Sequence, residues 1–216
     1  MRKYLFKSLL ALLLVIGATS FQVIAQENDM GDVMANITKT LDLSESQAAQ
    51  VEVLLIQYRA KLDGILLKYE GEEEPEVDKM IGEIRDAKDG YRKELEGLLS
   101  PDQYTTYISI VNGIMTDMFN NLAFIRLLEI QPHVDLTDGQ VESLVPILGK
   151  SMMSTVQLMF ENAGKRLSVP KKLGIKNDMK KIEKEKRTAM EQIMTGTQMA
   201  AYDQYKEEQK AARKGK

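Results

Sequence analysis

The sequence contains no cysteine and no tryptophan, and it has only one histidine and 5 prolines among 216 residues. Without cysteine there can be no disulfide, no thiol nucleophile and no thiolate metal site. A Ser-His-Asp site would have to use His133, and no nucleophile-elbow sequence accompanies it. His133 follows Pro132 in an expected interhelix loop, where we expect it to be exposed or locally hydrogen-bonded. Thiol chemistry is therefore excluded, and nothing in the sequence points to a Ser-His-Asp site or to a pair of catalytic carboxylates.

Other ligand-binding signatures are missing as well. The sequence has no P-loop and no dinucleotide-binding fingerprint. Glu72, Glu73 and Glu74 form an acidic run, but its spacing is not that of an EF-hand, and a solvated turn is the better interpretation. We therefore predict a protein that is not an enzyme and that needs neither a cofactor nor a metal ion.

Residues 1–25 have the pattern of a signal peptide. Three basic residues precede an apolar run over residues 9–16, and Ala25 suits cleavage directly before Gln26. The run is short and ends near Gly17, so we favour cleavage over an uncleaved anchor, which is the alternative. The mature protein is thus predicted to be periplasmic or secreted.

The remaining composition favours helix, because Leu, Ala, Glu, Lys, Met and Gln are plentiful and strand-forming runs are scarce. Apolar residues recur at helical spacing through most of the chain. We predict an all-α fold of about six helices, arranged as two related three-helix units in an elongated bundle. The expected helices cover residues 44–70, about 75–98, 100–131, a stretch from about 137, 176–194 and 196–212.

Prolines and glycines set the expected helix limits. Pro132 is expected to end the third helix, and Pro146 is expected to kink the fourth. Gly164, Pro170 and Gly174 predict a loop over residues 164–174. The third helix has apolar residues beyond a single stripe, so we expect it to be central and mostly buried. Its predicted stripe consists of Tyr104, Ile108, Val111, Met115, Met118, Leu122 and Ile125.

Four motifs of the pattern Leu/Met-Ser/Thr-x-x-Gln occur at expected helix starts, as LSESQ, LSPDQ, LTDGQ and MTGTQ. A Ser or Thr in this position accepts a hydrogen bond from an otherwise unpaired amide. The Gln three residues later can bond back to the amide of the cap, and the preceding apolar residue can pack five positions ahead. The motif residues are Leu43, Ser44, Gln47, Leu99, Ser100, Gln103, Leu136, Thr137, Gln140, Met194, Thr195 and Gln198.

The spacing of the motifs indicates an internal duplication. The first two are 56 residues apart and the last two 58, and the two pairs are offset by 93 and 95 residues. The flanking sequences agree, since Asp-Leu-Ser at 42–44 corresponds to Asp-Leu-Thr at 135–137. We predict a first three-helix repeat over residues 26–132 and a second over 133–216. One chain would then be a monomeric pseudo-dimer.

On these motifs the chain resembles the Spy/CpxP-like periplasmic proteins, the LTxxQ-motif family. Met194 departs from the leucine of the family, and four motifs occur where members usually have two. The resemblance implies an all-α fold, no catalytic activity, a role in envelope stress, and ATP-independent chaperoning on a cradle-shaped dimer surface. We therefore expect an exported protein that binds unfolded clients. The alternatives are a structural or assembly module of the cell envelope with a fixed protein partner, or a secreted helical domain of another kind.

Charge is distributed unevenly along the chain. Residues 27–100 have a net charge of −9, whereas residues 165–216 have a net charge of +8. The stretch from Lys165 to Arg187 contains ten basic and three acidic residues. Solvated helix faces are the simplest interpretation. Peripheral contact with anionic lipid, or with an acidic client, is the alternative; we expect no nucleic-acid partner, because no aromatic residues are interleaved.

Methionine and phenylalanine in the middle of the chain have two interpretations. Methionine fills irregular cores, and it also forms adaptable binding surfaces. Core filling is the simpler explanation, and the sequence does not distinguish the two. The candidate apolar binding surface consists of Met115, Met118, Phe119, Phe124, Met152 and Met159.

Overall fold

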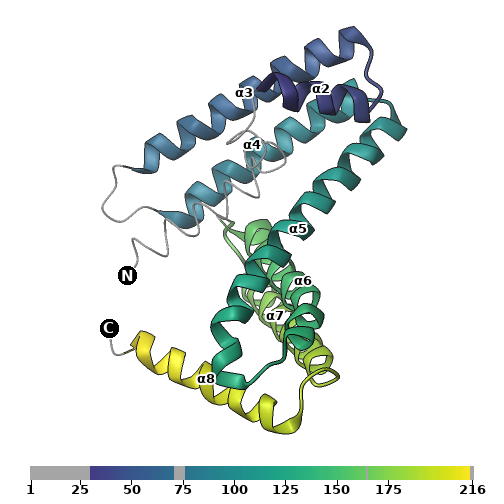
Figure 1. Cartoon of the computed structure of the whole chain (residues 1–216). Helices are drawn as coiled ribbons and strands as arrows, with labels where there is room; N and C mark the ends of the chain where they lie inside the picture. Colours follow the sequence, from purple (N-terminus) through teal and green to yellow (C-terminus); the bar gives the residue numbers. More distant parts are fainter. Residues whose placement is uncertain (1–29, 71–75, 164, 215–216) are drawn as a thin grey trace. The chain divides into compact units, whose positions relative to one another are not determined.

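A computed structural model describes residues 30–70, 76–163 and 165–214, which form helices and contain no strand (Figure 1). The prediction of an all-α protein is confirmed, but these residues form seven helices rather than about six. The predicted signal peptide and the acidic turn at residues 71–75 lie outside the described residues. The helices are α2 (Met30–Thr40), α3 (Glu45–Glu70), α4 (Val77–Leu98), α5 (Pro101–Val134), α6 (Asp138–Asn162), α7 (Val169–Met190) and α8 (Gly196–Lys214).

The additional helix is α2, which precedes the first motif. Met34 and Leu41 are buried and Ile37 is partly buried in the same core as α3 and α4. Residues 34, 37 and 41 have helical spacing, so α2 places one apolar face on this core. Sequence analysis missed α2 because no capping motif marks its start.

Three expected helix limits were wrong: the end of α5, the start of α7, and the end of α7, which lies at Met190 rather than at residue 194. α5 continues through Pro132 to Val134; the proline removes one hydrogen bond, and the helix ends two residues later. α7 begins inside the expected loop, at Val169, with Pro170 in its first turn, where the missing amide proton has no cost. Pro146 lies within α6, and the kink expected there stays a prediction.

The chain divides into two compact units. Unit 1 contains the described residues up to Met115 together with residues 159–166, and unit 2 contains residues 116–158 and those from Leu167 onwards. α5 and α6 therefore contribute residues to both units. The repeat boundary between residues 132 and 133 was inferred from the motif spacing and stays a prediction.

The core of unit 1 lies between α3 and α4, which run side by side (Figure 1). The rings of Tyr58 and Tyr91 stack with their centroids 4.6 Å apart. The end of α6 packs on α4: Arg85 Nη1 donates to the carbonyl of Ala163 at 2.7 Å. Almost a third of α4 is buried, namely Met80, Ile81, Gly82, Ile84, Ala87, Tyr91 and Leu95.

The core of unit 2 combines residues of α5, α6 and α8 with the end of α7. Only Met190 of α7 is buried. Gly149 of α6 lies so close to Asn120 of α5 that an added Cβ would be 3.1 Å from the backbone nitrogen of Asn120. The buried cluster is Ala123, Leu127, Ile130, Val134, Leu136, Val141, Leu144, Leu148, Met190, Met194, Met199, Tyr202 and Tyr205.

α5 is not the central buried helix that its apolar composition predicted. None of the seven residues in its predicted stripe is buried, and Ile125 is 56% exposed. Instead, Tyr107 contributes to the core of unit 1, and Ala123, Leu127, Ile130 and Val134 contribute to that of unit 2. A helix that serves two cores has no need of one continuous apolar stripe.

Candidate functional site

The first two motifs cap their own helices. In the first, the amide of Ser44 donates to Gln47 Oε1 at 3.1 Å, and the amide of Gln47 donates to Ser44 Oγ at 3.2 Å. The second has the same pair of bonds between Ser100 and Gln103, at 2.9 and 3.3 Å. Each motif therefore satisfies two amides that a helix start leaves unpaired.

The same two glutamines also bond to each other, although they are 56 residues apart. Gln47 Nε2 donates to Gln103 Oε1 at 2.9 Å, and Gln103 Nε2 donates to Gln47 Oε1 at 3.4 Å. Their amide groups also reach the backbone just before the other motif: Gln47 Nε2 donates to the carbonyl of Leu98, and Gln103 Nε2 to that of Asp42, both at 3.1 Å. We call this arrangement of Gln47 and Gln103 the first glutamine clasp.

The third and fourth motifs form a second glutamine clasp of the same design, between Gln140 and Gln198. Each Nε2 donates to the Oε1 of the other residue at 2.9 Å. Gln140 Nε2 donates to the carbonyl of Ile193 at 2.9 Å, and Gln198 Nε2 to that of Asp135 at 2.7 Å. The capping bonds of Thr137 and Thr195 are between 2.9 and 3.2 Å.

The helix that precedes each clasp ends in the same way. Asp42 and Asp135 have positive φ values of 49° and 55°. After them, the amide of Leu43 donates to the carbonyl of Thr38, and that of Leu136 to the carbonyl of Gln131. This is the Schellman pattern of a helix C-terminus, in which the left-handed residue reverses the chain. The aspartate carbonyls freed by the turn then accept hydrogen bonds from the clasps.

The clasp residues have an architectural role. Leu43, Leu99, Leu136 and Met194 are buried beside the clasps, and each motif glutamine uses both ends of its amide within the fold. A ligand would have to displace several hydrogen bonds to reach these amides. The sequence pointed to the caps but not to the pairing, for which the nearly equal separations of 56 and 58 residues were the available signal.

The residues of the candidate apolar surface belong to both units. Met115 and Met159 belong to unit 1, whereas Met118, Phe119, Phe124 and Met152 belong to unit 2. Phe119 was a wrong choice as a surface residue, because it is 1% exposed and its ring packs in the interior. Met115, Met118 and Met152 are half-buried, and only Phe124 and Met159 are well exposed.

A more continuous apolar surface lies on α3. Val53, Ile56 and Leu67 are 54%, 52% and 69% exposed. Their spacing of three and eleven residues puts them on one helix face, with Ala60 and Gly64 between them. We call these five residues the α3 stripe. Sequence analysis missed it because the apolar pattern from Val51 to Tyr69, on the opposite face of α3, already explained the helix as one side of a core.

Charged residues border the α3 stripe on both sides. Along the helix, the first edge alternates between acidic and basic residues, and the second edge has basic residues. The stripe therefore has the form of a narrow apolar surface with charged margins. The first edge contains Glu52, Arg59 and Asp63, and the second contains Lys61 and Lys68.

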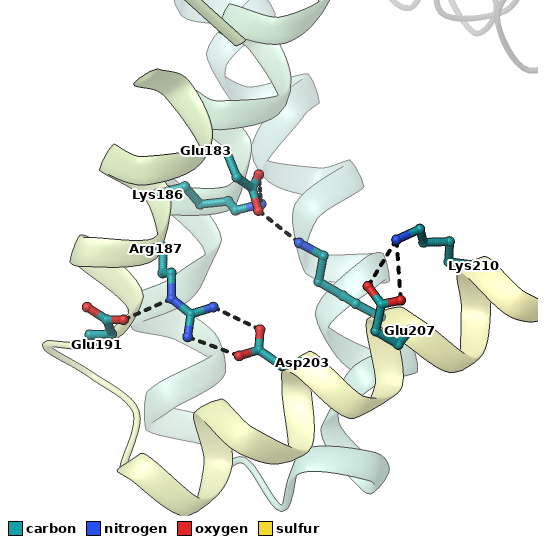
Figure 2. A network of polar contacts seen from close by, with 8 residues as sticks. Glu183, Lys186, Arg187, Glu191, Asp203, Glu207 and Lys210 are labelled. Carbon is teal, nitrogen blue, oxygen red and sulfur yellow. Dashed lines mark hydrogen bonds and ion pairs between the residues drawn. The ribbon is translucent and has the colours of Figure 1, made fainter. Parts of the chain in front are cut away.

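A network of charged residues joins α7 to α8 (Figure 2). Arg187 donates to both carboxylate oxygens of Asp203, at 2.8 and 3.0 Å, and to Glu191 at 3.0 Å. The hydrogen bonds from Arg187 hold the pKa of Asp203 below its usual value. These groups are about half exposed, so the network orients the helices more than it stabilises them.

Glu183 is the second acidic centre of this network. It accepts hydrogen bonds from Lys186 at 2.5 Å and from Lys206 at 2.8 Å. Burial alone would raise the pKa of Glu183, but the two lysines outweigh it, and the pKa lies below its usual value. Glu183 and Glu185, which pairs with Lys181, thus have basic partners within the protein.

His133 occupies the last turn of α5 rather than a loop. It is exposed, and its ring centroid lies 4.9 Å from that of Tyr205. Within the described ranges, no cluster of three or more His, Asp or Glu side chains is arranged to hold a metal ion. None of the described helices is both long and apolar enough to cross a membrane.

Comparison of the chain with family models, with curated proteins and with solved structures gave no match.

Proposed function

We propose that this protein is an exported, non-enzymatic binding protein that holds partly unfolded polypeptides on the α3 stripe without using ATP. The observation that supports this proposal is the exposure of Val53, Ile56 and Leu67 on one face of a long helix. Apolar residues exposed in a row and bordered by charge are typical of interaction surfaces. The resemblance of the motifs to the Spy/CpxP-like family points in the same direction.

The chemistry of the stripe favours changeable clients over one fixed partner. Interfaces with a fixed partner usually depend on buried Trp, Tyr or Arg residues that fill pockets. The α3 stripe consists of aliphatic and small side chains, and its centre at Ala60 and Gly64 has no protruding group. Such a surface suits weak contact with many extended apolar segments.

The proposal includes an internal duplication in which α5 is shared. Each copy would contain a short helix, a left-handed aspartate, two long helices and a final motif-started helix. The equal hydrogen bonds of the two clasps support it, as do the matching apolar residues of α2 and the end of α5. These matches, at an offset of 93, are Met34 with Leu127, Ile37 with Ile130, and Leu41 with Val134. Light scattering should then report a monomer, and a tight dimer would count against a pseudo-dimer.

Aggregation of chemically unfolded client proteins tests the proposed function. The exported protein, at an amount equal to the client and without ATP, should suppress light scattering for several unrelated clients. A variant with Val53→Ser, Ile56→Ser and Leu67→Ser should lose most of this suppression. These positions are exposed, so the variant should keep its helical circular dichroism.

A matched control distinguishes the α3 stripe from general stickiness. Phe124, Ile125 and Leu128 of α5 are 43–56% exposed in unit 2, and changing all three to Ser removes a similar apolar area. This control should suppress aggregation as well as the parent does. Absence of suppression by the parent with every client would overturn chaperoning, and saturable capture of one envelope protein would support the fixed-partner alternative.

A further inference from the structure

We propose that the outer face of α7 docks on an anionic lipid surface. This face is a row of four lysines that continues from two exposed apolar residues at the start of the helix. The residues are Val169, Lys172, Leu173, Lys176, Lys180 and Lys184, which we call the α7 face.

Helical spacing places these residues on one side of α7. Val169, Leu173, Lys176, Lys180 and Lys184 are separated by steps of four, three, four and four residues. The row is roughly 22 Å long at about 1.5 Å per residue. All six residues of the α7 face are exposed, and Val169 and Leu173 are 80% and 59% exposed. The opposite side of the helix holds the half-buried residues Ile175, Ile182 and Ala189.

The lysines of the α7 face have no acidic partner among the described residues. The ion pairs of α7 involve Lys181, Lys186 and Arg187, and they engage Glu183, Glu185 and Glu191. Glu183 is held further by Lys206 of α8. Glu183 and Glu185 are thus paired elsewhere, and by helical position Asp178 lies on the opposite side of α7. The α7 face is therefore positive on a chain whose net charge is negative.

The apolar residues favour a lipid surface over an acidic polypeptide. A row of lysines alone would attract either partner. Val169 and Leu173, in the first two turns, add side chains that can enter the boundary between headgroups and acyl chains. Lysines that follow in a straight line can then contact anionic headgroups on a flat surface at the same time.

Flotation with lipid vesicles tests this inference on the exported protein, with its N-terminus determined so that no apolar leader is left. It should bind vesicles that contain phosphatidylglycerol and should not bind pure phosphatidylcholine. Changing Lys172, Lys176, Lys180 and Lys184 to Gln should weaken binding about 1,000-fold. Raising the salt concentration should weaken binding by the parent protein.

Two further variants separate the contribution of the apolar residues, and that of net charge alone, from the contribution of the lysine row. V169S/L173S keeps every charge and should weaken vesicle binding about 10-fold. The control K39Q/K79Q/K93Q/K150Q changes the net charge by the same amount elsewhere, at four exposed lysines, and should alter binding less than about 3-fold.

Three outcomes would overturn the inference: no binding of the parent to anionic vesicles, an equal loss in the lysine control, or no effect of V169S/L173S together with equally tight binding to soluble polyglutamate. The last outcome would assign the face to an acidic polypeptide. Client suppression through the α3 stripe is measured without lipid, so either proposal can fail alone.

Discussion

α4 and α7 are used differently, although each is the last helix before the second motif of a clasp. α4 buries seven residues, whereas α7 buries Met190 alone and leaves most of its length exposed. The clasps at the ends of these stretches are the same in their hydrogen bonds. The motifs therefore specify how helices start and meet, while the helix faces between the motifs can differ in burial and charge.

The divergence has a simple chemical basis. α4 places Ile81, Ile84, Tyr91 and Leu95 on one side, which is enough to form the centre of a core. α7 has fewer large apolar residues, and its lysines occupy the remaining positions. A helix with so thin an apolar side packs on its neighbours at one edge and presents the rest to solvent.

The largest expected effect comes from truncating one isoleucine in each of the two helices. Ile84→Ala in α4 removes a side chain that is 2% exposed and should lower the free energy of unfolding of unit 1 by about 2–5 kcal/mol. Ile182→Ala in α7 removes a half-buried side chain and should cost about 1 kcal/mol or less. Denaturant unfolding followed by circular dichroism measures both. Equal losses would mean that α7 is as deeply packed as α4.

A smaller effect on stability, opposite in sign in the two units, is expected when one glycine in each unit is changed to alanine. Gly149→Ala should destabilise unit 2 by about 1–3 kcal/mol, because its Cβ would meet Asn120, including a backbone atom at 3.1 Å. Gly90→Ala in α4 is the matched control, since nothing lies within 4 Å of its added Cβ. It should stabilise unit 1 by about 0.5–1 kcal/mol. Thermal melts of the two variants should shift in opposite directions; a destabilised Gly90→Ala would contradict the open space around α4.

The smallest effect on stability is expected in unit 1, and it appears only at alkaline pH. Burial raises the pKa values of Tyr58, Tyr91 and Tyr107 above the ordinary value of 10.0. The fold thus favours the neutral phenols, and their contribution is complete below about pH 10 and is lost as the pH rises further. Unfolding free energies measured from about pH 9 to 11 should fall. Tyr58→Phe should reduce the number of protons released on unfolding at alkaline pH by about one, so the unfolding free energy should fall less steeply with pH. An unchanged slope would contradict the raised pKa of Tyr58.

Much of the fold was readable from the sequence, because helix starts and apolar periodicity are local signals. The starts of α3, α5, α6 and α8 follow from the four motifs. α2 was missed because it has no such motif. The start of α7 was missed because Pro170 and Gly174 were interpreted as loop residues, whereas proline suits a first turn.

The candidate site was less predictable, because burial depends on packing between distant segments. The buried and exposed faces of α3 are both aliphatic, so composition alone did not distinguish the core side from the α3 stripe. The same limit applied to Phe119, which looked like the exposed Phe124 in sequence and is buried. Pairing of the glutamines depends on contacts between residues 56 and 58 apart, which no local pattern specifies.

A double-mutant cycle on the glutamines tests most directly that the motifs act as pairs within each unit. Gln47→Ala and Gln103→Ala should show a coupling of about 1–2 kcal/mol in unfolding free energy, and so should Gln140→Ala and Gln198→Ala. The cross pair Gln47→Ala with Gln140→Ala should be additive within about 0.5 kcal/mol. Additive effects within the clasps, or coupling across the cross pair, would contradict the account.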